Sequence, residues 1–322
     1  MSSVASTPLR VSLLLILVVL GTHFLAVTSI TTPSTHTRVG TMNAVITGAN
    51  RGLGLELVKQ LCAAKEGADA AAISMNKVYA LCRKTSDALS TLSSNNEKVI
   101  IVENIDVASD DVTQQLQSVF GCSAEDNETP ISIDLLIHNA GAFGPPESTT
   151  NQSIYETQSL ENITMDRMRH AFELNTLGPL RVTQALLPNL RRKAAAAASD
   201  NDVFSPKIII ISSLLGSMTD NTSGGSYGYR TAKAGVNMVG VSLAQDLRQD
   251  GIAVGLVHPG FVLTGFGGTD GKDHPEENRR PGQQSVGPSA KGILDAVDAI
   301  TMDNTGAFWH GNYGEGVKPI NW

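Results

Sequence analysis

The segment Ala44-Val45-Ile46-Thr47-Gly48-Ala49-Asn50-Arg51-Gly52-Leu53-Gly54 joins a short apolar run to a glycine-rich turn. Apolar residues then recur at Leu55, Leu57, Val58 and Leu61, which is the spacing of an amphipathic helix. A strand, a glycine turn and a helix in this order suit phosphate binding, because glycine lets the backbone approach and the helix start offers N–H groups. The spacing is G-x-x-x-G-x-G rather than G-x-G-x-x-G, and a tight structural connection explains the turn equally well when it is taken alone.

The rest of the chain alternates short apolar runs with longer amphipathic segments. Strands are expected near residues 44–47, 77–82, 98–102, 133–138, 207–212, 252–257 and 306–309, and helices near 52–64, 110–119, 164–190, 226–249 and 288–300. This alternation predicts an α/β fold with a single Rossmann-like, doubly wound parallel sheet and helices on both faces. A ligand of such a sheet binds at the carboxyl ends of its strands. The alanine run 194–198 is interpreted as a helix end or a surface insertion.

Composition is that of a globular protein. The chain has 322 residues, of which 41% are hydrophobic and 17% charged, so it has ample material for a core. Its net charge of −7 argues against a general nucleic-acid binder, which needs a basic surface. Three cysteines, Cys62, Cys82 and Cys122, predict neither a disulfide framework nor a metal site.

Tyr229 and Lys233 stand four residues apart in an expected helix, sixteen residues after Ser213. Side chains at this spacing share one helix face. An ammonium beside a phenol favours the phenolate and lowers its pKa from about 10. The pair is therefore a candidate general acid for a carbonyl oxygen, although a half-buried aromatic with a solvated lysine is the plainer interpretation of the spacing alone. Tyr227 is excluded as the general acid, because the residue four positions after it is Thr231 and not a lysine.

Further motifs follow the glycine turn in a fixed order. They are the run Asp134–Gly141 that ends in Asn-Ala-Gly, Asn175 within Glu173–Leu180, the run Ile208–Ser213, and Val254–Gly260 with its Pro-Gly end. Together with the Tyr-x-x-x-Lys pair, these elements resemble the short-chain dehydrogenase/reductase family over residues 42–322. The stretch Asp220–Gly240 and the tail Gly311–Trp322 are similar to its branch of C-factor and sniffer-type carbonyl reductases.

The resemblance implies roles for four catalytic residues. Tyr229 exchanges a proton with the substrate oxygen, and Lys233 lowers the pKa of that phenol and binds the nicotinamide ribose. Ser213, rather than Ser212, hydrogen-bonds the substrate oxygen. Asn175 anchors a water chain that leads to Lys233, and it also fits a polar residue that stabilises a helix distortion. Nicotinamide supplies the hydride, so no metal is required.

The resemblance also implies a dinucleotide site. Its glycines cradle the pyrophosphate, Asp106 lies near the adenine or caps the next helix, and Thr264 meets the nicotinamide amide. The implied contacts are Gly48, Asn50, Arg51, Gly52, Leu53, Gly54, Arg83, Asp106, Val107, Asn139, Ala140, Gly141, Tyr229, Lys233, Pro259, Gly260, Val262 and Thr264.

Preference for NADP(H) is predicted at the end of the second expected strand. An NAD-selective site usually places a carboxylate there, but this chain has Cys82 followed by Arg83 and Lys84. Arg51 in the glycine turn adds a further cation. A guanidinium can hold a 2′-phosphate through paired hydrogen bonds, whereas solvated loop residues are the plainer interpretation.

Two functions remain open from the sequence. One is an NADP(H)-dependent carbonyl reductase or alcohol dehydrogenase acting on a small molecule, and the other is a non-catalytic dinucleotide-binding protein that senses redox state or signals. The intact catalytic set favours the enzyme. The polar segment Phe261–Pro288 lies where this family places its substrate lid. His138 and His258 are interpreted as structural.

A homodimer or homotetramer is also expected from the resemblance. The expected helices at 110–119 and 164–190 correspond to those that pair across a two-fold axis in this family. An apolar face on the second helix could be supplied by Leu174, Leu177, Leu180, Leu186 and Leu187, unless these leucines pack only on the sheet.

The N-terminus predicts targeting. Arg10 precedes an apolar stretch from Val11 to Val27, and small residues follow at 26–29. This pattern is typical of a secretory signal peptide over residues 1–29, a membrane anchor or another targeting sequence, including an ER-derived route to an organelle. A Thr-, Ser- and Pro-rich linker is expected at 30–41, and the chain is cytoplasmic if the segment is not used. Sequons begin at Asn127, Asn151, Asn162 and Asn221.

Overall fold

The structure is a computed structural model that describes residues 41–63, 74–121, 130–144, 155–199, 204–264, 266, 281–312 and 316–322. Its strands are β1 (Thr41–Thr47), β2 (Ser74–Leu81), β3 (Val99–Val102), β4 (Leu135–His138), β5 (Lys207–Ile211), β6 (Ala253–His258), β7 (Phe308–Asn312) and β8 (Gly316–Pro319). The α-helices are α1 (Gly52–Ala63), α2 (Asp87–Asn95), α3 (Val112–Phe120), α4 (Met165–Phe172), α5 (Gly178–Ser199), α6 (Tyr227–Asp246) and α7 (Val286–Ala299).

The strands form one sheet in the order β3-β2-β1-β4-β5-β6-β7-β8. All neighbours from β3 to β7 are parallel, and only β8 is antiparallel. Strands β4 and β6 are fully buried along their length, because a parallel sheet is covered on both faces. The chain reverses its direction of travel across the sheet between β1 and β4, and ligands bind at such a switch point. The expected doubly wound fold is confirmed.

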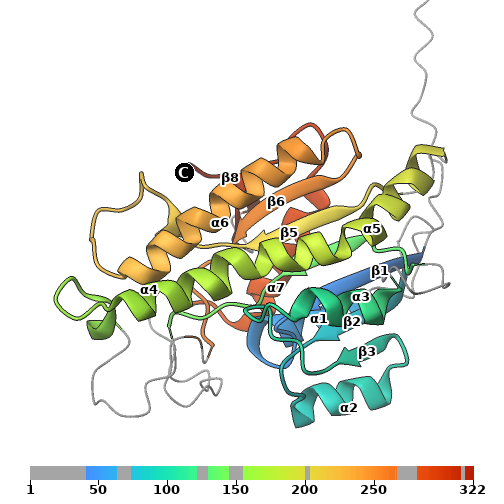
Figure 1. Cartoon of the computed structure of the whole chain (residues 1–322), viewed down its shortest axis with the longest axis horizontal. Coiled ribbons are helices and arrows are strands. Elements are labelled where there is room, and N and C mark those ends of the chain that lie inside the picture. Colours follow the sequence, from blue (N-terminus) through green and yellow to red (C-terminus); the bar gives the residue numbers. More distant parts are fainter. Residues whose placement is uncertain are drawn as a thin grey trace, which may run out of the picture. The chain divides into compact units, whose positions relative to one another are not determined.

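Helices cover both faces of the sheet, as Figure 1 shows. Helices α1, α2 and α7 pack with one apolar cluster, which includes Leu57, Leu89 and Ile293. Helices α3, α5 and α6 pack with the other, which includes Leu116 and Leu186. Apolar burial of this kind contributes roughly 25 cal/mol per Å².

Two elements differ from the expected list. Helix α2 was not expected, because it buries only Leu89 and therefore has almost no apolar periodicity. Ser86 nevertheless caps it, since its side chain accepts a hydrogen bond from the Leu89 N–H. Strand β8 was also missed, because it is a short, mostly exposed edge strand that ends in Pro319.

The expected helix 164–190 is not continuous. It is interrupted by a π-helical turn, η2 (Glu173–Leu177), and then continues as α5 to Ser199. The alanine run 194–198 is therefore an extended helix end. Leu186 is fully buried, so it belongs to the core and cannot supply an oligomer interface.

Several sequence predictions lie outside the described residues. These are the targeting segment 1–29 and linker residues 30–40, Cys122, the sequons at Asn127 and Asn151, and most of the expected lid, 267–280. Among the described helices, none combines the length and apolar character that a membrane crossing requires. Cys82 is buried in the core, and burial raises the pKa of the Cys62 thiol to about 11.

Candidate active site

Three side chains predicted to act together meet after β5 and at the start of α6. The Tyr229 hydroxyl hydrogen-bonds the Ser213 side chain. The Lys233 ammonium lies 5.7 Å from the centroid of the Tyr229 ring and donates to the Ile211 carbonyl over 2.8 Å. Helix α6 brings the phenol and the ammonium to one face, as the four-residue spacing predicts.

Burial governs the ionisation of this pair. Tyr229 is 6% exposed and Lys233 5% exposed. Burial raises the pKa of Tyr229 above its usual value, and the hydrogen bond from Ser213 only partly opposes it. Burial also lowers the pKa of Lys233 to about 8. The predicted lowering of the phenol pKa by Lys233 is thus not the dominant effect, because loss of solvent disfavours both charged forms.

The structure separates the two serines and the two tyrosines that compete in the sequence. Ser212 is buried and donates to Asn237 Oδ1 over 2.5 Å, whereas the Tyr229 hydroxyl bonds Ser213. Tyr227 is 37% exposed, whereas Tyr229 is buried beside Lys233. Ser213 and Tyr229 are therefore the members of each pair that lie together.

Asn175 lies in the π-helical turn η2, buried at 1% exposure. Its Nδ2 donates to the carbonyls of Ala171 and Ala142, each over 2.9 Å, and its Oδ1 accepts from the Ala142 N–H. Pro179 has no N–H, so it cannot donate the usual helical hydrogen bond to the Asn175 carbonyl. The side chain stabilises the helix distortion, and the carbonyl has no ordinary helical partner.

The loop after β4 lies against these residues. A Cβ at Gly141 would stand 2.8 Å from Asn175 Oδ1 and 3.8 Å from Lys233 Nζ. Thr176 also donates to the Ala232 carbonyl over 2.7 Å, which ties the π turn to α6. Asn175 and Lys233 therefore belong to one packed group.

An aromatic cluster around Tyr229 was missed by the sequence analysis. The Phe143 ring stacks on the Tyr229 ring at 4.7 Å between centroids, with 20° between the planes. Tyr155 and Phe266 contact the same cluster edge-on. The side-chain amide of Gln158 joins this region, because it hydrogen-bonds backbone groups of Phe143, Gly228 and Tyr229. No local motif marks these residues, because they come from segments far apart in the chain.

The glycine turn packs against the Asn-Ala-Gly motif across the switch point. Asn139 Nδ2 donates to the carbonyls of Thr47 and Gly48 over 3.0 and 3.1 Å. The Thr47 hydroxyl accepts from the N–H groups of Asn139 and Ala140. A Cβ at Gly54 would lie 2.5 Å from Asn139 Nδ2, so only glycine fits there. The two predicted cofactor segments are thus one rigid unit.

Exposed cations border the same turn. Asn50 Nδ2 donates to the Lys84 carbonyl over 3.2 Å, which places the loop after β2 beside the glycine turn. Arg51, Arg83 and Lys84 are all exposed. Helix α1 has no acidic residue in its first turn, so no carboxylate of that turn opposes an anion at its start.

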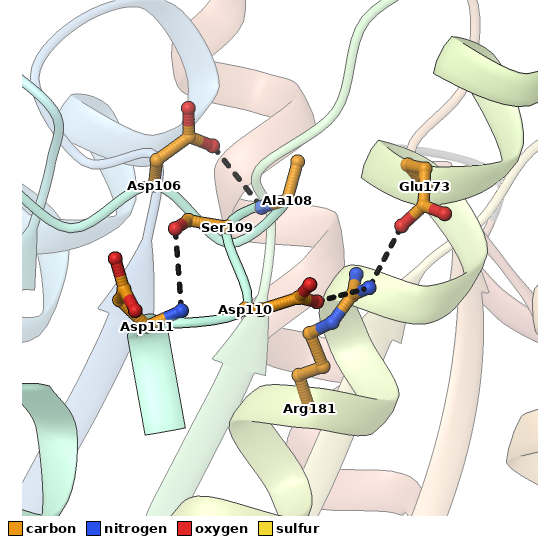
Figure 2. A network of polar contacts seen from close by, with 7 residues as sticks. All are labelled: Asp106, Ala108, Ser109, Asp110, Asp111, Glu173 and Arg181. Carbon is orange, nitrogen blue, oxygen red and sulfur yellow. Dashed lines mark hydrogen bonds and ion pairs between the residues drawn. The ribbon is translucent and has the colours of Figure 1, made fainter. Parts of the chain in front are cut away.

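Asp106 heads a polar network after β3 (Figure 2). Its Oδ1 accepts from the Ala108 N–H over 3.1 Å, so it closes a turn and does not cap α3, whose N-cap is Asp111. Asp110 lies farther along the same loop. Arg181, on α5, contacts Asp110 at 3.0 Å and Glu173 at 2.8 Å. Arg181 therefore connects the predicted adenine-side loop, which includes Val107, to the π turn that holds Asn175.

The loop after β6 holds the remaining predicted contacts. Gln284 Nε2 donates to the Pro259 carbonyl over 2.7 Å, and Ser289 donates to the same oxygen over 2.8 Å. Val262 forms a parallel bridge with Gln284, and the Thr264 hydroxyl accepts from the Phe266 N–H. Positive φ at Gly260, 84°, turns the chain there.

The two histidines beside the motifs are structural in position. His138 Nε2 lies 2.9 Å from the Thr183 hydroxyl. His258 Nδ1 accepts from the Leu214 N–H. Burial lowers the pKa of both to about 3, so both are neutral. Within the described residues, no group of His, Cys, Asp or Glu could hold a metal ion.

Comparison with known proteins relates the sequence of this chain to one family of dehydrogenases. The short chain dehydrogenase family pattern matches residues 42–274. C-signal of Myxococcus xanthus is 34% identical over 177 residues, which is 55% of this chain and 87% of that protein. A 1-hydroxy-2-glutathionyl-2-methyl-3-butene dehydrogenase from a Rhodococcus species is 34% identical over 200 residues, 62% of this chain and 74% of that one.

Solved structures agree with the sequence relatives. The NADPH-bound carbonyl reductase from chicken fatty liver superposes with a TM-score of 0.68 at 27% identity, covering 88% of this chain and 99% of that one. The carbonyl reductase Sniffer of Drosophila melanogaster gives 0.66 at 27% identity, covering 87% and 99%. The chain therefore belongs to the short-chain dehydrogenase/reductase family of oxidoreductases, near its C-signal and sniffer-type carbonyl reductase branch.

Proposed function

We propose that this chain is an NADP(H)-dependent reductase that converts a carbonyl compound to an alcohol, or runs the reverse reaction, with Tyr229 as the proton donor. The observation that carries the proposal is that the half-buried Ser213 hydrogen-bonds the buried Tyr229, which lies beside the buried Lys233, after β5 and at the start of α6. A phenol hydrogen-bonded to a serine there is positioned for general acid catalysis.

The residues of the chain divide the work around the substrate oxygen. The reduced nicotinamide supplies the hydride, so the protein supplies the proton and the orientation. Tyr229 delivers its hydroxyl proton to the oxygen, and Ser213 holds that oxygen near the phenol. Burial keeps Tyr229 protonated at neutral pH, which suits the direction of reduction. Lys233 and Asn175 belong to one packed group beside this site. In the proposal they supply the proton that Tyr229 takes up after it has given its own to the substrate.

The residues present fit a dinucleotide with a 2′-phosphate. The glycine turn and the start of α1 carry no carboxylate that would repel a pyrophosphate. Arg51, in the turn after β1, and Arg83, in the loop after β2, lie on adjoining loops, and guanidinium groups form strong charge-assisted hydrogen bonds to a phosphate. The carbonyl reductase of chicken fatty liver, a structural neighbour, was solved with NADPH bound.

The test is to measure NADPH consumption by the purified protein in the presence of a panel of aldehydes, ketones and quinones. We expect turnover with at least one class and weaker activity with NADH. Tight NADPH binding without reduction of any compound in the panel would contradict the proposal that the protein is a reductase. That result would favour a dinucleotide-binding sensor, the alternative that similarity to C-signal keeps in view.

A further inference from the structure

We propose that Gln158, in the 3₁₀ turn η1 (Glu156–Gln158), is a positioning residue that holds Tyr229 and its stacked partner Phe143 in register for proton transfer. The inference rests on the proposed function of Tyr229. It assigns Gln158 a role in the reaction although that side chain contacts neither predicted cofactor segment, the glycine turn or the Asn-Ala-Gly motif, in the structure.

Gln158 closes the start of helix α6 from outside that helix. Its Oε1 accepts from the N–H of Gly228 over 2.9 Å and from the N–H of Tyr229 over 3.3 Å. The first N–H groups of a helix have no partner within the helix and must be satisfied from elsewhere. Gln158 therefore fixes the backbone of the very residue that carries the phenol.

The helix has no cap of its own. Ser226 occupies the N-cap position, but its φ is 51° and its side chain makes no capping hydrogen bond. Gly224 and Gly225 before it also have positive φ, 63° and 62°. A left-handed N-cap does not present its hydroxyl to the first turn, since the ordinary capping geometry needs an extended backbone. The cap is consequently supplied seventy residues earlier in the sequence.

The same amide reaches the ring that covers the phenol. Gln158 Nε2 donates to the Phe143 carbonyl over 2.9 Å, and the Phe143 ring stacks on Tyr229. One side chain thus holds both members of the stacked pair through their backbones. A helix start and a loop after β4 are joined at the point where the phenol is buried.

The amide is packed too tightly to turn. Gln158 is 1% exposed. A Cβ at Gly228 would stand 3.0 Å from Oε1, and a Cβ at Gly144 would stand 3.2 Å from Nε2. The amide packs between these two glycines. If it were flipped, its NH₂ group would face the N–H groups of Gly228 and Tyr229, which are also donors. A buried polar group with all partners satisfied in one orientation rigidifies its surroundings.

Three variants separate positioning from simple stability. Gln158→Met keeps the length and approximate volume but removes both the acceptor and the donor. Gln158→Glu keeps the acceptor always and the donor only while the introduced carboxyl is protonated. Asn189→Leu is the matched control, because Asn189 is also a fully buried amide that donates to two carbonyls, those of Phe120 and Ile131.

The control lies at the other end of the sheet. Ile131 precedes β4, whereas Phe143 and the predicted site follow it. Asn189→Leu therefore costs stability without touching the phenol. All assays are run well below the thermal midpoint of each variant, with NADPH and 4-nitrobenzaldehyde as the probe carbonyl, and with the Kd of NADPH measured separately.

We expect Gln158→Met to lower kcat by roughly 10- to 100-fold, because small displacements of a catalytic group cost about that much. Its Kd for NADPH should stay within about threefold of the wild type, because no predicted cofactor contact is changed. Asn189→Leu should lower the thermal midpoint but keep kcat within about twofold. A Gln158→Met enzyme with wild-type kcat, or a control that loses kcat equally, overturns the proposal.

Gln158→Glu supplies a pH readout that a purely structural role would not produce. A protonated carboxyl matches the amide with one donor and one acceptor, but an ionised one repels the Phe143 carbonyl. Burial raises the pKa of such a carboxyl. We expect kcat of Gln158→Glu near the wild-type value at low pH, and an additional fall of kcat as the pH rises that the wild type and Gln158→Met lack. Parallel profiles in all three proteins contradict the proposal.

Hydrogen exchange distinguishes a failed positioning role from a failed function. Peptides that cover residues 226–233 should exchange faster in Gln158→Met than in the wild type, because two amides of that segment lose their acceptor. Their exchange rate in Asn189→Leu should equal that of the wild type. A wild type that reduces no probe carbonyl contradicts the proposed function. The exchange result then decides alone whether Gln158 holds the helix start, and unchanged exchange overturns the inference.

Discussion

At the scale of single residues, the proposed proton donor is a phenol that burial keeps protonated. Tyr229 has almost no exposure, and its pKa lies above the usual value for that reason. A buried acid is poised to give a proton to a developing alkoxide but not to lose it to solvent. The proposed donor is therefore in the protonated form that reduction requires at neutral pH. The oxidising direction should gain rate as the pH rises.

Replacing Tyr229 with phenylalanine tests this donor. The ring and its stacking on Phe143 are kept, while the proton is lost. We expect Tyr229→Phe to lower kcat for reduction by about 10²–10⁴-fold, with NADPH binding largely unchanged. Tyr227→Phe is the control, because Tyr227 is on the same helix but exposed. Wild-type turnover by Tyr229→Phe on a verified substrate would refute the assignment.

At the scale of elements, the loops that follow β1, β2 and β4 meet at the switch point of the sheet. The amide of Asn139 ties the β1 turn to the β4 loop, and the amide of Asn50 ties it to the β2 loop. These bonds set the backbone, while the exposed Arg51 and Arg83 remain at the rim. We propose that the choice between NADP(H) and NAD(H) depends on these two side chains, which the backbone of the two loops holds in place.

Preference for NADPH should depend on those two arginines. Charge-assisted hydrogen bonds contribute about 1.5–3 kcal/mol, so Arg51→Ala and Arg83→Ala should each weaken NADPH binding by roughly 10- to 100-fold. NADH binding should change much less, because NADH lacks the 2′-phosphate. Dissociation constants measured by titration give the answer, with Lys59→Ala on the exposed side of α1 as the control. Equal wild-type affinity for NADH and NADPH would contradict the prediction.

At the scale of the whole molecule, two histidines are buried neutral in the folded state. Their pKa values lie near 3, against about 6.5 in an unfolded chain. Between these values the unfolded state binds more protons, so stability is present above pH 6.5 and is lost as the pH falls. Each histidine can contribute about 1.4 kcal/mol of lost stability per pH unit in that window.

Acid stability measurements test this linkage. His138→Gln keeps a hydrogen-bonding partner for Thr183 but does not titrate. We expect a smaller loss of unfolding free energy between pH 6.5 and about 4 than in the wild type, measured by urea denaturation at several pH values. His170→Gln, at an exposed position on α4, should follow the wild type. An unchanged slope in His138→Gln would show that this histidine does not control acid unfolding.

A homodimer or homotetramer is the proposed solution state. Leu174, Leu177, Leu180 and Leu187 are half-buried in the single chain, whereas Leu186 is already part of its core. Light scattering at micromolar concentration should report at least twice the mass of the chain. Leu187→Glu should shift the population toward the monomer and leave the fold intact. A wild-type monomer would contradict this prediction.

The amino-acid sequence by itself determined the parallel sheet, the glycine turn and the four residues proposed for catalysis. Apolar runs mark buried strands, and four-residue spacing on one helix already places Tyr229 beside Lys233. The Asn175 distortion was also foreseen as an alternative. These features depend on short-range periodicity and on motifs in a fixed order, which can be read along the chain. Helix α2 and strand β8 were missed because their residues are mostly polar or exposed.

Only the tertiary structure decided how the phenol is held and what its environment does to it. The Phe143 stack, the cap from Gln158 and the direction of the Lys233 ammonium toward Ile211 all join segments far apart in sequence. Burial, rather than the nearby lysine, sets the direction of the Tyr229 pKa shift. The physical reason is that desolvation and long-range hydrogen bonds depend on three-dimensional packing, which no local pattern of residues encodes.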